Sequence, residues 1–193
     1  GMYILEPEIF GLIPPDREYD FGKDLFPHLL RSDMNLFGYI TTGYWKDIGN
    51  LHEYQSACQD ILEYNVAIDF KGSTSEHGLI GEHCNISESV QWSGRSIIGD
   101  GVSIGPNSSI HQCIIGNDVN IGAGTQLSNC IIWNNVQLGD RIMASYDVIC
   151  NNTSIGNGVT INEQVFIAEH CHIGNGSHLS SNIKLWPKKH IEE

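Results

Sequence analysis

Large apolar residues recur every six positions along the second half of the chain, from Ile80 to Leu185. Three steps, 110 to 115, 127 to 132 and 144 to 149, are five residues long and lie 17 residues apart. A period of six with three steps per repeat predicts a triangular prism of parallel strands, in which each coil stacks on the coil before it. The recurring anchors are Ile80, Ile86, Trp92, Ile98, Ile104, Ile110, Ile115, Ile121, Leu127, Ile132, Leu138, Ala144, Ile149, Ile155, Ile161, Ile167, Ile173, Leu179 and Leu185.

The residues around each anchor fit the inside of a narrow prism. Glycine often follows the anchor, as at Gly99 and Gly122, where a tight corner favours a residue without a side chain. Four residues after the anchor the side chain is small or β-branched, as at Val102 and Thr125. This pattern resembles the hexapeptide signature of the left-handed parallel β-helix, and the hand is taken from that resemblance. We therefore expect a mainly β protein with about six coils over residues 80–187.

Residues 1–65 lack the repeat and predict a small, partial α/β segment. Strands are expected at residues 2–5 and 36–42, and helices at residues 6–13 and 24–30. Asn50, followed by Glu53, forms a capping box that opens a helix ending near residue 65. Residues 66–79 are then a connector and residues 188–193 a tail.

The charge of the chain excludes some partners. Lys and Arg total 10, whereas Asp and Glu total 23, which gives a formal net charge of −13. Phosphates would repel such a chain, so we expect no nucleic-acid or membrane partner. No apolar run reaches the roughly 18 residues of a membrane span. The six cysteines form no C-x-x-C pair, which favours a reduced, cytoplasmic protein.

Several short blocks occur in order: M-Y-I-L-E-P at residues 2–7, D-F-G-K-D-L-F-P at 20–27, G-Y-W-K-D-I-G at 43–49 and L-W-P-K-K-H-I at 185–191. Together with the repeat they resemble bacterial sugar-nucleotide pyrophosphorylases, in particular the mannose-1-phosphate guanylyltransferase type. Such enzymes also carry a G-x-G-T-R-L loop for the triphosphate, a metal-binding Asp and an E-K-P motif, and none of these motifs is in this sequence. The resemblance therefore implies the C-terminal part of a sugar 1-phosphate nucleotidyltransferase without its nucleotide-binding region.

The same resemblance implies two site residues but no catalytic one. Asp47 matches a metal-binding Asp of the family, and Mg²⁺ there neutralises phosphates while a sugar phosphate attacks the triphosphate and releases pyrophosphate. The partner Asp is missing, so the site is incomplete, and the alternative is that Asp47 caps the turn before Asn50. Lys23 faces the sugar phosphate by resemblance, or else is an exposed lysine at a helix start. We expect Mg²⁺ in the complete enzyme and no cofactor in this chain.

Several other side chains allow two structural or functional interpretations. Tyr44 and Trp45 either wall a sugar site or pack between the first segment and the prism. Cys113, Cys130 and Asp147 fall in one column, which predicts either a ladder of stacked residues or a cysteine redox pair. The histidines of the prism are compatible with a hexapeptide acyltransferase, which uses a His as a base. The regular spacing of the anchors, however, leaves no room for the protruding loop of those enzymes.

Two functions from different classes remain open: an inactive enzyme portion that acts as an oligomerisation or regulatory module, and an acyltransferase. Unpaired strands in residues 1–65 would favour a homo-oligomer. A separate polypeptide that supplies the nucleotide-binding half is a second partner to consider. The sequence does not determine which sugar and which base are used, whether the β-helix binds an effector, or how many subunits assemble. It also leaves open why the nucleotide-binding half is missing.

Overall fold

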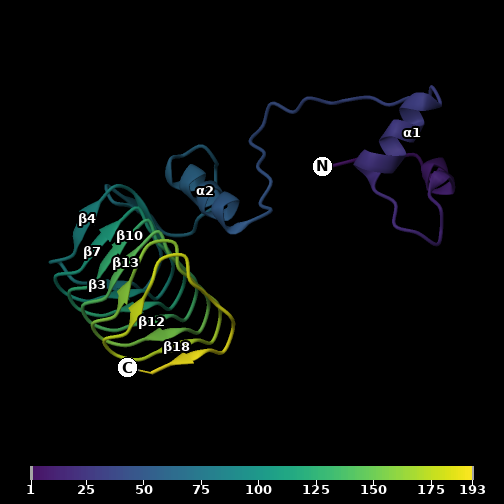
Figure 1. Ribbon diagram of the computed structural model, residues 1–193. Helices are drawn as coiled ribbons and strands as arrows, with labels where there is room; N and C mark the ends of the chain where they lie inside the picture. Colours follow the sequence, from purple (N-terminus) through teal and green to yellow (C-terminus); the bar gives the residue numbers. More distant parts are fainter. Residues whose placement is uncertain (1, 193) are drawn as a thin grey trace. The chain divides into compact units, whose positions relative to one another are not determined.

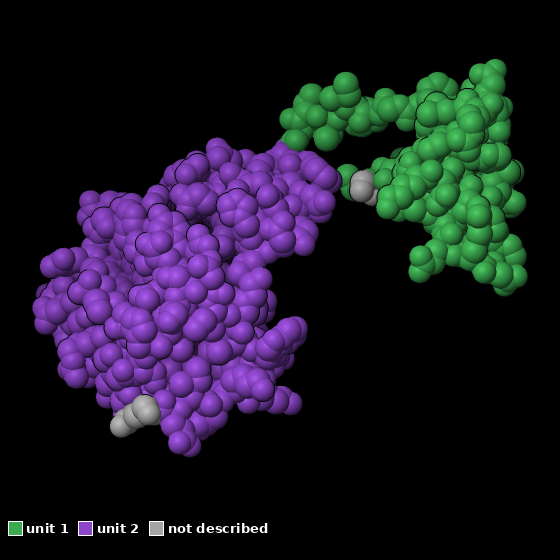
Figure 2. Space-filling view, in the orientation of Figure 1, with its two compact units in different colours: residues 1–43 green, residues 44–193 purple. Residues whose placement is uncertain are grey.

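The computed structural model describes residues 2–192. The chain divides into two compact units, residues 1–43 and residues 44–193 (Figure 2). The helix that begins after Asn50 therefore belongs with the prism, whereas the sequence grouped it with residues 1–43.

Residues 78–191 form a three-sided parallel β-solenoid (Figure 1), which confirms the predicted prism. One face, called here the first sheet, has the order β1-β2-β5-β8-β11-β14-β17-β20, and only the β1–β2 pair is antiparallel. Its strands are β1 (Ser73–Ser75), β2 (Gly78–Ile80), β5 (Ser96–Ile98), β8 (Ile114–Ile115), β11 (Ile131–Ile132), β14 (Val148–Ile149), β17 (Phe166–Ile167) and β20 (Lys184–Leu185).

The other two faces are parallel throughout. The second sheet contains β3 (Asn85–Ile86), β6 (Ser103–Ile104), β9 (Asn120–Ile121), β12 (Gln137–Leu138), β15 (Ser154–Ile155), β18 (His172–Ile173) and β21 (His190–Ile191). The third sheet contains β4 (Gln91–Ser93), β7 (Ser109–His111), β10 (Gln126–Ser128), β13 (Met143–Ser145), β16 (Thr160–Ile161) and β19 (His178–Leu179). The solenoid has about seven coils rather than about six, because β21 pairs with β18 within the expected tail.

The anchors fill the interior as the period predicted. Ile98, Ile110 and Ile149 are each 0 % exposed, and the small residues beside them, such as Val102, are buried as well. One apolar cluster runs through all the coils. Burial of this continuous column stabilises the stack, and each coil depends on the next for its own burial.

Asparagine and aspartate side chains link the corners of successive coils. The backbone N–H of Asp100 donates to Oδ1 of Asn117 at 2.9 Å, and that of Asn117 donates to Oδ1 of Asn134 at 2.8 Å. Where glycine follows the anchor, it leaves room for this ladder, since a Cβ on Gly116 would lie 2.5 Å from Oδ1 of Asn134. Close approach between coils thus explains that glycine, rather than the tight turn expected from the sequence.

The unit formed by residues 1–43 is helical. It contains the 3₁₀-helix η1 (Pro7–Leu12), the single π-helical turn η2 (Phe21–Leu25) and the helix α1 (Phe26–Arg31), which agree with the two predicted helices in position. Leu25 and Leu29 are its buried side chains, and the rings of Phe21 and Phe26 lie 6.0 Å apart.

The two strands expected in this unit are absent. Residues 2–5 and 36–42 are extended or irregular, with Ile4 fully exposed and Tyr39 94 % exposed. A strand needs a hydrogen-bonded neighbour, and no segment within residues 2–192 pairs with either of them. Apolar composition alone was therefore a poor guide to these two segments.

Replacing an anchor should test the interior column. We expect Ile149→Ala to lower the free energy of unfolding by about 2–5 kcal/mol, because it opens a cavity in a fully buried position. Urea denaturation measures the change. Gln137→Ala, on the outer side of β12, is the control and should stay within about 0.5 kcal/mol. Equal effects of the two substitutions would contradict the structure.

Candidate functional site

The helix α2 (Leu51–Leu62) begins as the sequence predicted. The Asn50 side chain accepts a hydrogen bond from the Glu53 N–H at 2.9 Å, which satisfies one free donor of the first turn. The helix ends at Leu62, three residues before the expected end. Leu51, Tyr54 and Cys58 lie on one side of it, at the spacing of an amphipathic helix.

An apolar stripe on the outside of the first sheet receives this helix. The strands of that sheet from β2 to β17 each place one large apolar residue outward, next to the inward anchor, whereas β20 has Lys184 there. The outward residues pair in register from coil to coil: Leu79, Ile97, Ile114, Ile131, Val148 and Phe166. The corresponding positions of the second sheet are Asn, Ser, Gln and His instead.

This outward stripe was missed in the sequence, although a signal for it is present. From Leu79-Ile80 to Phe166-Ile167, the hexapeptides of the first sheet carry two consecutive apolar residues, as in Ile97-Ile98, whereas those of the second sheet carry one. The first residue of each pair must face outward because neighbouring side chains of a strand alternate. An outward apolar residue on six successive coils predicts a covering element, and α2 fills that role.

The contact between α2 and the stripe is partly apolar and partly polar. Leu51, Tyr54 and Cys58 pack against the buried cluster of Ile131, Val148 and Cys150. The indole N–H of Trp133 donates to the Tyr54 hydroxyl at 3.0 Å, and the two rings meet edge to face. Burial raises the pKa of Tyr54 to about 12, so its hydroxyl stays protonated.

The segment before α2, residues 44–50, is fixed along the helix by Asp60. The Tyr44 hydroxyl donates to Oδ2 of Asp60 at 2.7 Å, and the Lys46 ammonium group donates to the same oxygen at 2.5 Å. Lys46 also contacts the Ser56 hydroxyl. These hydrogen bonds lower the pKa of Asp60 and raise that of Lys46. The W-K-D-I-G block is thereby held on the solenoid through α2.

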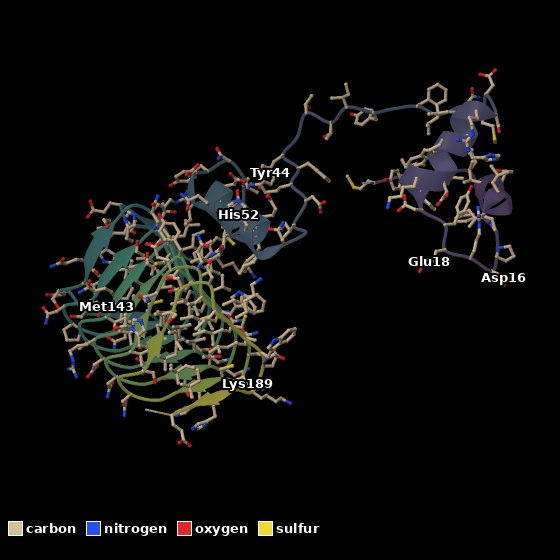
Figure 3. The ribbon with its side chains drawn as sticks, viewed as in Figure 1. Asp16, Glu18, Tyr44, His52, Met143 and Lys189 are labelled. Atoms are coloured by element: carbon tan, nitrogen blue, oxygen red, sulfur yellow. The ribbon has the colours of Figure 1, made fainter. Side chains whose placement is uncertain are left out.

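Trp45, inside that block, is 57 % exposed, and Tyr44 is 48 % exposed. Both residues belong to the same unit as the solenoid, and Figure 3 shows Tyr44 beside α2. Tyr44 uses its hydroxyl to fix the segment, and Trp45 leaves more than half of its surface free. Within residues 44–193, neither ring is buried in a core, and packing against residues 1–43 stays a prediction.

Neither sequence-derived site residue has a complete site around it. Asp47 is exposed, and α2 is capped by Asn50 rather than by Asp47. Within residues 2–192 no group of three or more His, Cys, Asp or Glu side chains is placed to hold a metal ion. A single exposed carboxylate does not fit Mg²⁺, which needs several oxygen ligands. Lys23 is exposed in η2, in the other unit, where its N–H donates to Oδ1 of Asp20 at 2.7 Å.

The column of Cys113, Cys130 and Asp147 lies inside the solenoid, and each residue is 0 % exposed. All six cysteines are free thiols. Both thiols are fully buried in an apolar interior, where loss of hydration disfavours the thiolate. Since the thiolate is the reactive form, this favours stacked ladder residues over a redox pair.

Asp147 is a carboxyl group in an apolar interior. Its two oxygens accept hydrogen bonds from the Ser145 N–H at 2.9 Å and the Val165 N–H at 2.8 Å. Burial nevertheless raises its pKa to about 7, because the ionised form loses its hydration. This group was identified in the sequence only as a member of the column, because its titration follows from burial.

Three histidines of the solenoid, His111, His172 and His178, contact the coil next to them. Nδ1 of His111 lies 2.9 Å from the Ser93 hydroxyl oxygen, and Nδ1 of His172 lies 2.7 Å from that of Ser154. Coil pairing continues in register from β2 to β20, without an interrupting loop. The acyltransferase alternative gains nothing from this arrangement.

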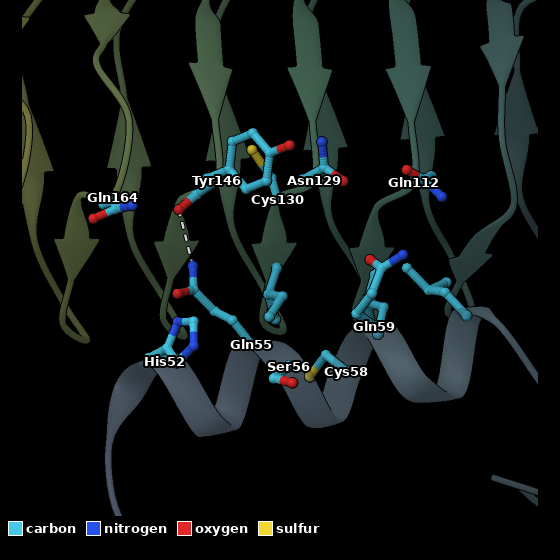
Figure 4. A pocket seen from close by; sticks show the side chains of 13 residues that line it. His52, Gln55, Ser56, Cys58, Gln59, Gln112, Asn129, Cys130, Tyr146 and Gln164 are labelled. Atoms are coloured by element: carbon cyan, nitrogen blue, oxygen red, sulfur yellow. Dashed lines mark hydrogen bonds between the residues drawn. The ribbon is translucent and has the colours of Figure 1, made fainter. Parts of the chain in front are cut away.

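A cleft of about 470 Å³ lies between α2 and one corner of the solenoid (Figure 4). The corner supplies Gln112, Asn129, Tyr146 and Gln164, one from each of four successive coils, and these four residues are called the corner column. Facing them on α2 are His52, Gln55 and Gln59. Gln55 bridges the two walls by donating to the Tyr146 carbonyl at 2.9 Å. The sequence did not predict this cleft, since the docking of α2 creates it.

Truncating Tyr54 should loosen α2. We expect Tyr54→Ala to weaken the helix by about 2 kcal/mol, because it removes an aromatic contact and leaves the Trp133 N–H without its acceptor. Hydrogen exchange of the α2 amides should then accelerate more than tenfold, since about 1.4 kcal/mol corresponds to a factor of ten. Tyr39→Ala, an exposed tyrosine in the other unit, should leave these rates unchanged. Unaltered exchange in Tyr54→Ala would contradict the docking.

Ionisation of Asp147 should make the solenoid less stable at higher pH. The unfolded carboxyl titrates near 3.8 and the folded one near 7, so the folded state binds the extra proton between these values. The free energy of unfolding should therefore fall as the pH rises from 4 to 7 and then level off, by on the order of 2–4 kcal/mol.

Urea denaturation of wild type, Asp147→Asn and Asp118→Asn at pH 5 and pH 8 tests this dependence. Asp147→Asn cannot ionise and should lose the difference between the two pH values, even if its stability changes at both. Asp118→Asn, at an exposed corner, should keep the wild-type difference in stability between pH 5 and pH 8. The expectation would be wrong if Asp147→Asn retained the wild-type difference.

Both parts of the chain match known protein families. The family described as the EIF2B subunit epsilon LbH (left-handed β-helix) domain matches residues 79–179, and the nucleotidyl transferase family matches residues 1–64. Within residues 2–192, no helix is both long and apolar enough to cross a membrane.

Curated relatives are sugar 1-phosphate nucleotidyltransferases that use different bases. A glucose-1-phosphate adenylyltransferase of Desulfitobacterium hafniense is 28 % identical over 52 % of this chain and 29 % of its own length. A UTP–glucose-1-phosphate uridylyltransferase of Synechocystis is 30 % identical over 59 % of this chain and 32 % of its own. A mannose-1-phosphate guanylyltransferase of Mycobacterium tuberculosis is 26 % identical over 57 % of this chain and 31 % of its own. The chain thus spans about a third of the relatives that it matches.

A solved structure, the acetyltransferase domain of PglB from Neisseria gonorrhoeae, is 18 % identical, with a TM-score of 0.44, over 67 % of this chain and 60 % of that one. At this identity and score the likeness carries no argument about function. The family is therefore assigned from the sequence matches and the solenoid. The chain belongs to the family of the EIF2B subunit epsilon LbH domain, and it corresponds to the C-terminal part of the sugar-nucleotide pyrophosphorylases.

Proposed function

We propose that this chain serves an enzyme that joins a sugar 1-phosphate to a nucleotide and releases pyrophosphate, and that residues 1–193 alone do not catalyse the reaction. In this proposal the solenoid is an oligomerisation and regulatory module. Mannose 1-phosphate and GTP are the favoured substrates, on the resemblance of the sequence blocks. The relatives transfer adenylyl, uridylyl or guanylyl groups, so the base is the first variable to test.

The observation that carries the proposal is the attachment of the W-K-D-I-G block to the solenoid. Tyr44 and Lys46 fix the block to Asp60 of α2, and α2 packs on the outward stripe. Asp47, in the middle of this block, is exposed and free to face a neighbouring domain. A module of this kind would position one carboxylate for a site that is completed by other residues.

A metal ion would supply charge neutralisation for the phosphates in the complete enzyme. Asp47 would be one of its ligands there, and Lys23 would be a point charge for the sugar phosphate. Neither role needs these two residues to form a site on their own. Both roles stay predictions for the complete enzyme.

Association with a second copy of the chain is supported by an exposed aromatic surface. Trp133, Phe166 and Trp186 line an apolar groove of about 360 Å³ on the first sheet, beside α2. Trp186 is 75 % exposed and Trp133 is 38 % exposed. Burying such side chains against a second copy would remove a large apolar area from water.

Pyrophosphate release by the purified chain tests the catalytic half of the proposal. We expect no release with Mg²⁺ and GTP plus mannose 1-phosphate, or with ATP or UTP plus glucose 1-phosphate, because Asp47 lacks its partner Asp and the sequence carries no G-x-G-T-R-L loop. Release that disappears in Asp47→Ala would show a complete site and overturn the proposal. Thiol release from acetyl-CoA, assayed in parallel, would support the acyltransferase alternative instead.

Sedimentation velocity tests the assembly half. Wild type at micromolar concentration should sediment as an oligomer, and Trp186→Ala should shift it toward the monomer because it removes the most exposed ring of the groove. Met143→Ala, exposed on the third sheet, is the matched control and should sediment like wild type. A wild-type monomer would contradict this half.

A further inference from the structure

We infer that the cleft between α2 and the corner column binds a neutral sugar ring through its hydroxyl groups. Nothing in the proposed transferase reaction assigns a ligand to this place. The inference goes beyond the proposed function by giving the module a ligand class, and it depends on neither catalysis nor oligomerisation.

The charge of the cleft selects against ions. Its 13 lining residues include no Asp, Glu, Lys or Arg, and His52 is the one lining side chain that could carry a positive charge. A phosphate would therefore be desolvated with at most one cationic partner, which is costly. Its volume of about 470 Å³ lies within the range of about 300–1,000 Å³ of small-molecule sites. A neutral ligand of modest size fits both facts.

The polar groups of the cleft are mostly carboxamides. Gln112, Asn129 and Gln164 come from the corner column, and Gln55 and Gln59 come from α2. Each carboxamide has an acceptor oxygen and two donor hydrogens, which is the combination that a hydroxyl group can use in either direction. Among residues 2–192, the side-chain amides of Gln112 and Gln164 make no hydrogen bond, so both are free for a ligand.

The regular coils give these amides a fixed spacing. Strands of successive coils are about 4.8 Å apart, so the amides of the column are repeated at roughly the width of one sugar ring. Their backbones are held in the left-handed region, with φ of 48° at Gln112 and 64° at Gln164. Rigid coils thus pre-organise the polar wall, which lowers the entropic cost of binding.

The apolar part of the cleft suits the other side of a sugar. Ile114, Ile131 and Leu62 supply apolar lining beneath the amides, and the Tyr146 ring, 49 % exposed, stands at the corner. A pyranose has C–H groups on its faces and hydroxyls around its edge. The amides of the cleft match the hydroxyl groups at the ring edge, and its apolar side chains match the C–H groups of the ring faces.

Titration followed by NMR of the side-chain NH₂ groups tests this inference on the full chain. The probes are methyl α-mannopyranoside and methyl α-glucopyranoside, which are neutral, and inorganic phosphate. We expect saturable shifts of the glutamine and asparagine NH₂ signals of the cleft with at least one glycoside, and none with phosphate. Binding of phosphate at the cleft, or no saturable shift with either glycoside, would overturn the inference.

Two substitutions remove amides without disturbing the backbone. Asn129→Gly and Gln164→Gly stand at left-handed corners, where glycine is favourable, so both variants should fold. Each should weaken glycoside binding about fivefold or more, since a hydrogen bond contributes about 1 kcal/mol. Asn152→Gly, a left-handed corner residue outside the cleft, is the matched control and should bind like wild type. Equal affinity in all three variants would place the ligand elsewhere.

These outcomes are separate from the tests of the transferase and of the oligomer. Glycoside binding without pyrophosphate release would leave the proposed function intact. Pyrophosphate release without glycoside binding would overturn the proposed inactivity and this inference independently.

Discussion

The register between coils is the constraint on which the rest of the structure depends. Backbone hydrogen bonds place each residue directly over the residue 17 or 18 positions earlier, as with Asp147 over Cys130 and Cys130 over Cys113. Any chemical property repeated at that spacing therefore becomes a continuous column. Anchors form the apolar interior, Asn117 and Asn134 form a corner ladder, and Ile131 and Val148 form the outward stripe. The interior, the outward stripe and the cleft wall are accordingly organised in columns rather than in loops.

Much of the solenoid was predictable because its signal is repeated many times. The spacing of the anchors gave the parallel coils, their inward residues and the stacking of Cys113 on Cys130 without any long-range information. The cap at Asn50 was equally local, because it requires only two residues three positions apart. Such features depend on short segments. In the solenoid, the repeat period alone determines which segments lie next to each other.

The features that were not predicted depend on distant partners. Residues 2–5 and 36–42 have apolar strand-like sequences, but a strand exists only where another segment pairs with it. The final strand β21 was missed because its anchor, Ile191, lies one step beyond the end taken for the repeat. The cleft at Gln112 and Gln164 arises only when α2 docks on the stripe. The ionisation of Asp147 likewise follows from complete burial, which spacing suggests but does not measure.

The corner ladder also determines how such a molecule can change its length. Each coil presents the next one with the same pattern of backbone groups and corner amides, so a whole coil is an interchangeable unit. Loss or gain of a full coil beyond Gln164 would shorten or lengthen the column while the cleft kept all four of its corner residues. A change of one residue is accommodated at a corner, since coils of 17 and of 18 residues stack in the same register. Loss of a residue within a strand would instead move the neighbouring side chains of that strand out of their columns. Insertions and deletions in this solenoid are therefore expected as whole coils or as single residues at corners.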